Sequence, residues 1–522
     1  MAVMPAVADT LISSPPWVAR RWFTPSGALV AEAAAGLAPT DVFARLGRLP
    51  HAIFLDSAAT DAAEPTTAGP ERPRLGRYSF VAADPIHSVH VEQTGDLSAD
   101  AQALAAAFAQ LRRLLGELRS PTIPGLPPFQ GGLAGFVAYE CGLARFGLPT
   151  PPARDPLVPL LVMHVYDVVF AFDHDLGRGW FISQGVPATG PEARRRRATE
   201  RLDAVLAAAP PPAAAPPPAA ATVADPAPST LPGHPLPGHA GVWSTHSRPA
   251  YLDMVRAGIE CVRAGDIFQA NLAQRFTVAA AVDPLTVYDA ARRANPAPFA
   301  GFFAAGRCAI ASMSPERFLQ VGRGVVRMHP IKGTRRVIAS PEADLFAGDD
   351  LEASAKDRAE NVMIVDLVRN DLARVCTPES VRVEALCRLE RYRYVQHLVS
   401  IVAGRLRPGL GPLDALEAAI PGGSVTGAPK HRACEIISAL EGVARGAYCG
   451  SLGYLGLDGS ADFNLLIRTL VVGPDRISFA AGGGITAASD PAAEYAESLH
   501  KAEGMLRVLA ALGIVQPAEV GG

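Results

Sequence analysis

The chain has 522 residues and a formal net charge of −3, from 48 Lys and Arg against 51 Asp and Glu. This balance supplies no extended positive field, which argues against a nucleic-acid partner. Hydrophobic residues make up 49% of the chain, a share that excludes global disorder. The seven cysteines are scattered singly with no C-x-x-C pair, which favours a reducing cytoplasm. We find neither a signal-peptide pattern nor an uninterrupted apolar run of membrane-spanning length, so we expect no membrane partner.

The first 206 residues contain short β-like runs separated by glycine-rich turns. The runs are residues 52–55, 78–81, 157–162 and 165–172. They do not alternate regularly with helical segments, so a doubly wound parallel sheet is not favoured.

An Ala/Pro-rich segment divides the chain at residues 207–239. Of its 33 residues, 11 are alanine and 11 are proline, and Asp225 is its one charged residue. Proline lacks a backbone donor and the segment has few large side chains to bury, so we predict a linker or surface loop. The predicted organisation is an N-terminal region, 1–206, and a C-terminal catalytic domain, 240–522.

Three helices with clear start signals are predicted in the C-terminal domain. Ser247 is a candidate N-cap followed by Pro249, and apolar residues continue at helical spacing to near Gly265. A second helix is predicted over residues 359–375, and a third begins at Asp490, an N-cap followed by proline. Strands and helices in this arrangement predict an α+β fold.

Two residues outside the helices could supply chemistry if they share a cavity. Glu316 and Lys332 would then act as a general acid and a nucleophile. Lys332 would need its pKa lowered by burial or nearby positive charge before it could attack at neutral pH. Taken alone, a lysine in this setting is more often an exposed loop residue.

Glycines and charges near the C-terminus suggest anion binding. Gly482–Gly484 follow an apolar strand, where glycines allow close approach to an anionic ligand or simply form a turn. Glu494, Glu497 and Lys501 fall on one face of the last helix, which is also typical of a salt-bridged solvent face. The run Gly422–Gly427 has P-loop spacing but lacks the following Lys-Ser/Thr pair, so we reject a nucleotide site.

Eight motifs follow one another along the C-terminal domain. They are SPERF (314–318), PIKGT (330–334), KDRAENVMIVDLVRNDLARVC (356–376), VQHLVS (395–400), PGGSVTGAPK (421–430), RGAYCGSLGY (445–454), IRT (467–469) and GGGIT (482–486). Together they resemble the chorismate-utilising family that includes anthranilate synthase component I and aminodeoxychorismate synthase component I. Fainter matches in the N-terminal region are FLDSA (54–58), GRYSF (76–80) and PFQGGLAGFVAYE (128–140). The resemblance implies a chorismate-binding α+β fold with antiparallel sheets flanked by helices.

The third position of the PIxGT motif differs between family members. Anthranilate synthases typically have alanine there, whereas aminodeoxychorismate synthases typically have lysine, as this chain does at Lys332. The resemblance implies amination of chorismate by ammonia to 4-amino-4-deoxychorismate, on the route to 4-aminobenzoate and folate. Lys332 would add covalently to the ring as the 4-hydroxyl leaves, and ammonia would then displace the lysine. Glu316 would protonate the departing hydroxyl.

The resemblance also assigns the remaining site residues. Glu360 and Glu497 would bind Mg²⁺, which prefers oxygen ligands, and His397 would be a further catalytic residue. The substrate-binding positions would be Gly333, Thr334, Thr426, Tyr448, Arg468, Gly482, Gly483, Gly484 and Lys501. An L-tryptophan pocket, found in some members, would comprise Ser57, Arg77, Tyr78, Ser79, Phe80, Pro298, Phe299 and Ala300. Beside that serine stands Asp56, where glutamate is usual.

The source of ammonia and two alternative functions stay open. No Cys-His-Glu glutaminase segment is recognisable, so we expect ammonia from a glutamine amidotransferase subunit or from solution, and aminodeoxychorismate as the released product. Formation of anthranilate or aminodeoxyisochorismate, with attack at C2, is one alternative. The other is a non-catalytic tryptophan-binding regulatory subunit. Against it stand five intact residues: Glu316, Lys332, Glu360, Arg468 and Glu497.

Overall fold

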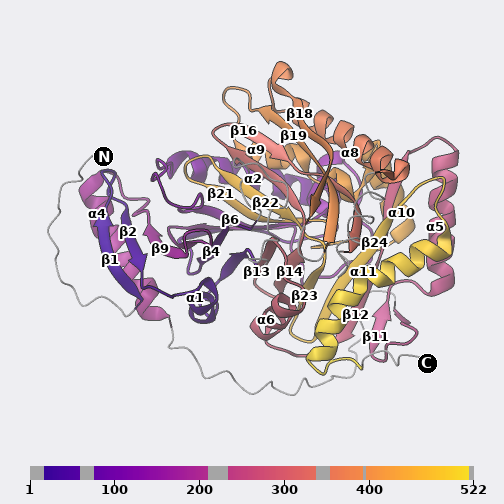
Figure 1. Cartoon of the computed structure of the whole chain (residues 1–522), viewed down its shortest axis with the longest axis horizontal. Coiled ribbons are helices and arrows are strands. Elements are labelled where there is room, and N and C mark those ends of the chain that lie inside the picture. The colour runs from indigo at the N-terminus through magenta and orange to yellow at the C-terminus, as the bar shows by residue number, and fades with distance from the viewer. Residues whose placement is uncertain (1–16, 59–75, 210–232, 337–352, 392–394, 517–522) are drawn as a thin grey trace.

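The computed structural model describes residues 17–58, 76–209, 233–336, 353–391 and 395–516 (Figure 1). Two large antiparallel sheets form the centre of this part of the chain. The first sheet runs, from neighbour to neighbour, through β1 (Val18–Phe23), β2 (Leu29–Ala33), β9 (Arg178–Ser183), β8 (Val168–Asp173), β4 (Tyr78–Ala82), β3 (Ile53–Asp56), β13 (Phe299–Ala304), β14 (Ala309–Ser314), β23 (Thr469–Val472), β24 (Arg476–Ile485), β12 (Gln269–Ala279), β11 (Val242–Ser244) and β10 (His234–Pro235), with β20 (Gly427–Ala428) beside β12.

The second sheet carries the lysine of the PIKGT motif on an edge strand. Its order is β17 (Ile331–Arg336), β19 (Val395–Arg405), β16 (Val325–Met328), β15 (Arg317–Gly322), β22 (Ala461–Leu465), β21 (Ser451–Gly456), β6 (Gly132–Val137), β7 (Leu161–Tyr166) and β5 (His87–Val91), with β18 (Arg382–Arg391) beside β19.

Helices cover the outer faces of both sheets. Against the first sheet pack α1 (Pro39–Leu46), α4 (Pro191–Ala208), α6 (Pro284–Ala294) and α11 (Pro491–Ala511). Against the second pack α2 (Leu97–Glu117), α3 (Glu140–Phe146), α8 (Ala355–Ala373) and α9 (Pro412–Ala419). The helices α5 (Arg248–Arg263) and α10 (Lys430–Glu441) share a smaller core with β12 and α11. Two short 3-10 helices are η1 (Pro378–Ser380) and η2 (Gly423–Val425).

The core follows from the period-2 alternation of the strands. On β7, Val162 and Tyr166 face a cluster between the two sheets, whereas Leu161, Met163 and Val165 face the helices outside. Because both faces of such strands are covered, both sets of side chains are apolar. The two sheets therefore form a sandwich with helices on either side, which confirms the predicted α+β class.

Strands from both sides of the Ala/Pro-rich segment share both sheets. In the first sheet β3 pairs with β13, so that Asp56 lies opposite Ala300. In the second sheet β6 pairs with β21. Figure 1 shows β1 and β2 at one end of the molecule and β11, β12 and α5 at the other. The division at 207–239 stays a prediction, and residues 210–232 lie outside the described residues.

Most predicted elements are present, with shifted boundaries. Ser247 and Asp490 cap α5 and α11 as predicted, each accepting a hydrogen bond from a backbone N–H of the first turn. The helix α8 begins four residues earlier than predicted because Ser354 caps it. The strand predicted at 157–162 was misplaced: β7 begins at Leu161, after a turn that contains Pro156. No helix of the described residues is long and apolar enough to cross a membrane.

Candidate active site

Lys332 lies beside an irregularity in the β17–β19 ladder. Lys332 pairs with Leu398 and Thr334 pairs with His397, so Gly333 is an extra residue in β17. Gly333 has φ +79°, a left-handed conformation that favours glycine. The glycine of PIKGT therefore forms the bulge next to the lysine. The side chain of Thr334 lies outside those described.

Four charged side chains surround the Lys332 amine. Burial lowers the pKa of Lys332, and the carboxylate of Glu360 raises it, while the Lys501 cation lowers it further. Glu316 and Glu497 also raise it. Groups from the β14–β15 connection, α8 and α11 thus act electrostatically on one partly buried amine. The lowered pKa brings the lysine closer to the neutral form that can attack an electrophile.

Glu316 is a buried carboxyl with a single hydroxyl partner. Glu316 is 7% exposed, and Ser424 Oγ donates a hydrogen bond of 2.7 Å to Glu316 Oε1. Burial raises the pKa of Glu316 to about 7, against the opposing effects of Ser424 and the Lys332 cation. Both protonation states are therefore populated near neutral pH, as a group that gives and takes protons requires.

Ser424 is a site residue that the sequence interpretation missed. The motif PGGSVTGAPK was assigned to the site through Thr426, but Thr426 Oγ1 donates to Gly422 O at 2.9 Å and Gly423 O at 3.3 Å. The Thr426 hydroxyl thus closes the turn that holds η2, and Ser424 reaches Glu316. The useful signal was the motif itself, since a second hydroxyl stands two residues before the threonine. Substrate binding by Thr426 stays a prediction.

The glycine strand β24 lies against the acidic face of α11. A Cβ on Gly483 would lie 2.7 Å from Glu494 Oε2 and 3.7 Å from Glu497 Oε1. Lys501 Nζ donates to Gly482 O at 2.9 Å and pairs with Glu497 at 2.7 Å. A larger residue at position 483 would therefore crowd the Glu494 carboxylate, and this flexible side chain would have to move. Glu494 is buried, so this face of α11 is not a plain solvent face.

His397 and Arg468 lie close enough to interact. Burial lowers the pKa of His397 to about 4, the Arg468 cation contributes, and a hydrogen bond with the Gly333 backbone opposes both. His397 is therefore a neutral imidazole at pH 7, suited to hydrogen bonding rather than to electrostatic attraction. Arg468 has φ +51°, and its carbonyl accepts a hydrogen bond of 3.0 Å from Met313 N–H.

Tyr448 lies beside Asn271, near the start of β12. Burial raises the pKa of Tyr448 well above its ordinary value, and the side chain of Asn271 acts against this shift. Asn271 pairs with Gly484 across the β12–β24 ladder. The predicted substrate positions Tyr448 and Gly484 thus meet at Asn271, a residue that the sequence interpretation did not single out.

Magnesium was predicted at Glu360 and Glu497. Among the described residues, no group of three or more His, Cys, Asp and Glu side chains is arranged to hold a metal ion. Glu360 and Glu497 nevertheless both act on Lys332, although they come from α8 and α11. Two carboxylates that approach one point are suitable Mg²⁺ ligands in chemical kind. The magnesium site stays a prediction.

The predicted tryptophan residues meet on three neighbouring strands, β4, β3 and β13. Ser57 Oγ donates to Tyr78 O at 2.6 Å, and Ser57 N–H donates to Ser79 Oγ at 3.0 Å. Asp56 accepts hydrogen bonds from Arg292 Nε at 2.5 Å and Tyr288 at 3.1 Å. Of the other members, Phe80 and Ala300 are buried, Arg77 is paired with Asp173, and Phe299 lies under the Arg317 guanidinium. Tryptophan binding itself stays a prediction.

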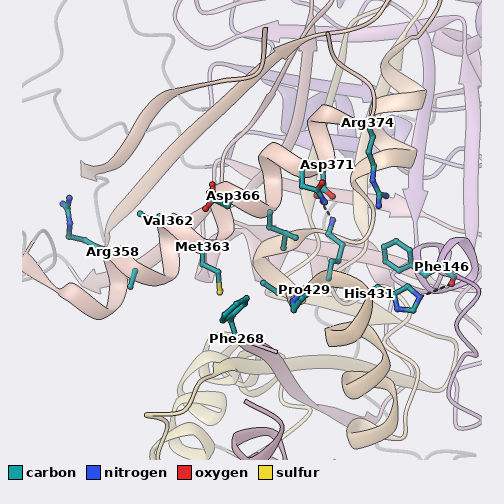
Figure 2. Close-up of a pocket in the computed structure, with 15 residues that line it drawn as sticks. Phe146, Phe268, Arg358, Val362, Met363, Asp366, Asp371, Arg374, Pro429 and His431 are labelled. Carbon is teal, nitrogen blue, oxygen red and sulfur yellow. Dashed lines mark hydrogen bonds and ion pairs between the residues drawn. The ribbon is translucent and has the colours of Figure 1, made fainter. Parts of the chain in front are cut away.

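A groove lies away from these residues, along α8 (Figure 2). Its volume is about 890 Å³, and none of the predicted site residues lines it. Figure 2 shows Val362, Met363 and Asp366 of α8 on one side and Phe268 and Pro429 on the other. Phe268 is 70% exposed, which makes this groove a markedly apolar part of the surface.

The two-sheet fold and the family match together define an enzyme that binds chorismate. Residues 63–507 match the family described as chorismate binding enzyme, and the chain belongs to this family. Aminodeoxychorismate synthase component 1 of Salmonella typhimurium is 34% identical over 474 residues, covering 90% of this chain and 95% of that protein. Anthranilate synthase component 1 of Streptomyces coelicolor is 37% identical over 441 residues, covering 83% and 80%.

A solved structure shows the same fold. Anthranilate synthase component I from Streptococcus pneumoniae TIGR4 has a TM-score of 0.65 and 29% identity, and the match covers 86% of this chain and 98% of that chain. The relatives are thus divided between two named activities at similar identity. They establish the family, and the choice of reaction depends on the site.

Proposed function

We propose that the chain aminates chorismate to 4-amino-4-deoxychorismate, as an aminodeoxychorismate synthase component I. The observation that carries the proposal is Lys332, a partly buried amine with a lowered pKa that interacts with the buried acid Glu316. Anthranilate synthases typically have alanine at this position, and alanine supplies no nucleophile. A lysine at the centre of the site supports a covalent route.

The two residues divide the chemistry between them. Neutral Lys332 forms a carbon–nitrogen bond to the chorismate ring as the bond to the 4-hydroxyl breaks. Protonated Glu316 gives its proton to that oxygen, which leaves as water, because hydroxide is a poor leaving group. Ammonia then forms a new carbon–nitrogen bond and displaces the lysine. Glu316 can recover a proton because its pKa lies close to neutral pH.

The remaining predicted residues bind and orient the substrate. Arg468 and the Gly482–Gly484 backbone are suited to hold carboxylates. Mg²⁺, held by Glu360 and Glu497, would supply positive charge for the ring carboxylate. We further propose a glutamine amidotransferase subunit as the source of ammonia and a cytoplasmic location. Relatives named component 1 support a second component.

Anthranilate formation is the second candidate, because relatives of that name match at 37% identity. Incubation of the protein with chorismate, Mg²⁺ and ammonium, followed by chromatography, separates the products. We expect aminodeoxychorismate, which an added lyase converts to 4-aminobenzoate. A fluorescent anthranilate product that needs no lyase would refute the proposal.

Tryptophan binding is proposed for the strand triplet β4, β3 and β13, independently of the reaction. The support is the assembly of Ser57, Ser79 and Ala300 on these strands. Titration calorimetry with L-tryptophan tests it. A Ser57→Phe variant should lose the binding heat, while heat that persists unchanged in this variant would place tryptophan elsewhere.

A further inference from the structure

Lys430, the first residue of α10, is a buried lysine outside the predicted site. Its ammonium donates three hydrogen bonds, to Asp371 Oδ2 at 2.6 Å, Pro421 O at 2.8 Å and Ala419 O at 3.0 Å. These three bonds use all three donors of a lysine. The Lys430 side chain is 7% exposed and that of Asp371 3%. Figure 2 shows the ion pair at Asp371, on the wall of the groove along α8.

The three acceptors lie on three segments: α8, α9 and the turn that follows α9. Asp371 lies on α8, the helix that carries Glu360. Ala419 ends α9, and Pro421 begins the turn that includes η2. The ammonium therefore joins α8 to the start of this turn, and the hydroxyl of Thr426 closes the turn at its other end.

A hydrogen bond links the anchored turn to the proposed catalytic acid. Ser424 lies inside it and donates to Glu316 Oε1 at 2.7 Å. A hydroxyl on a turn keeps such a bond only while the turn keeps its position, because one rotatable bond separates Oγ from the backbone. Lys430 holds the turn at the carbonyls of Ala419 and Pro421, three residues or more before Ser424.

We propose that Lys430 is a positioning residue that, with Asp371, fixes the turn from which Ser424 donates to Glu316. The proposal rests on the proposed function, in which Glu316 is the general acid. Lys430 and Asp371 line the groove along α8, and none of the predicted substrate positions is among the residues that line it. A purely structural ion pair would stabilise the fold without affecting Glu316.

The test replaces the pair by apolar residues in the double variant Lys430→Met/Asp371→Leu. Removing one partner alone leaves an uncompensated buried charge, whereas apolar replacement of both is often neutral for stability. The matched control is Arg201→Met/Asp167→Leu. This double variant removes the ion pair between Arg201 of α4 and Asp167, whose side chain is 1% exposed. If the double variant does not fold, Lys430→Met tests the same anchor, because burial already raises the pKa of Asp371 and this carboxyl can become neutral by taking up a proton.

Two measurements are made on each variant. The first is the titration of Glu316, followed through a ¹³C-labelled side-chain carboxyl and assigned by its loss in Glu316→Gln. Two groups lower the pKa of this carboxyl: the Ser424 hydroxyl through its hydrogen bond, and Lys332 through its positive charge. The second is kcat and KM for chorismate with ammonium as the nitrogen source.

We expect the midpoint of Glu316 to rise by about one pH unit in the double variant, as in Ser424→Ala, because a donor to the carboxylate is lost. We expect kcat to fall about tenfold or more with a KM within about threefold of the wild type. The control should keep both values. A folded double variant, or a folded Lys430→Met, with the wild-type midpoint and kcat would overturn the proposal. A wild type that makes no aminodeoxychorismate would refute the proposed function, while the titration would still test the anchor.

Discussion

Ser424 Oγ lies 2.7 Å from Glu316 Oε1, inside a buried site where burial keeps the pKa of this carboxyl at about 7. A hydroxyl can donate to the carboxylate and accept from the carboxylic acid. Ser424 can therefore hold Glu316 in one position through both protonation states. This property suits an acid that loses and regains a proton in every turnover.

Replacement of Lys332 by alanine tests the nucleophile. We expect the variant to lose aminodeoxychorismate formation while it keeps its circular dichroism spectrum, because the side chain lies on an edge strand whose ladder bonds are backbone bonds. Mass spectrometry of the quenched wild type with chorismate and no ammonia should find the adduct on the peptide that contains Lys332. Arg432→Ala, an exposed cation on α10, is the control. Wild-type output from Lys332→Ala would disprove the covalent role.

The acidity of Glu316 should set the alkaline limit of the reaction. The general acid must be protonated, so kcat should fall as the pH rises through about 7, the pKa of Glu316. The ammonium concentration must be adjusted to keep free ammonia constant, since its supply rises with pH. Glu316→Gln should lower kcat by about 10²–10⁴-fold and remove the fall of kcat at alkaline pH. If kcat of this variant still falls at the same pH, the fall reports the titration of another group.

The same carboxyl should make stability depend on pH. The pKa of Glu316 is raised from 4.5 to about 7 in the folded state, so the folded protein binds the proton more tightly than the unfolded chain. That contribution is fully present below pH 4.5 and is lost as the pH rises through 7. Between pH 4.5 and 7.5, the free energy of unfolding of Glu316→Gln should rise by about 3 kcal/mol relative to that of the wild type. Urea denaturation at both pH values measures this difference. A pH-independent difference would contradict burial of the acid.

Gly483 should be needed for the carboxylates of α11. An added Cβ would lie 2.7 Å from Glu494 Oε2, so Gly483→Ala should displace this side chain, which lies one turn before the predicted metal ligand Glu497 on α11. We expect the Mg²⁺ concentration for half-maximal activity to rise about tenfold or more, as for losses of groups that orient metal ligands. Gly116→Ala on α2 is the matched control, since its Cβ would meet no atom within 4 Å. Equal Mg²⁺ requirements in both variants would argue against this metal site.

Local signals in the sequence predicted local structure well. The caps Ser247 and Asp490 were identified because a capping side chain bonds within its own first turn. The pairing of β6 with β21 joins residues more than 300 positions apart, and no local pattern encodes it.

The sequence predicted which residues belong to the site, but it did not predict the hydrogen bonds between them. Glu316 and Lys332 were found through motifs, and the structure brings their charges together. The Ser424–Glu316 bond spans 108 positions, so the composition of either segment could not reveal it. Lys430 ends the motif PGGSVTGAPK and received no role, because its three partners come from separate elements in the folded chain.

The shared sheets also constrain how the chain folds as it leaves the ribosome. The partner of β3 is β13, which begins at Phe299, and the partner of β6 is β21, which begins at Ser451. When the first 209 residues have been synthesised, both sheets are therefore incomplete. One edge of β3 and one edge of β6 then lack their partner strands, β13 and β21. Open edges of this kind invite wrong pairing. The last third of translation completes the fold of the first third.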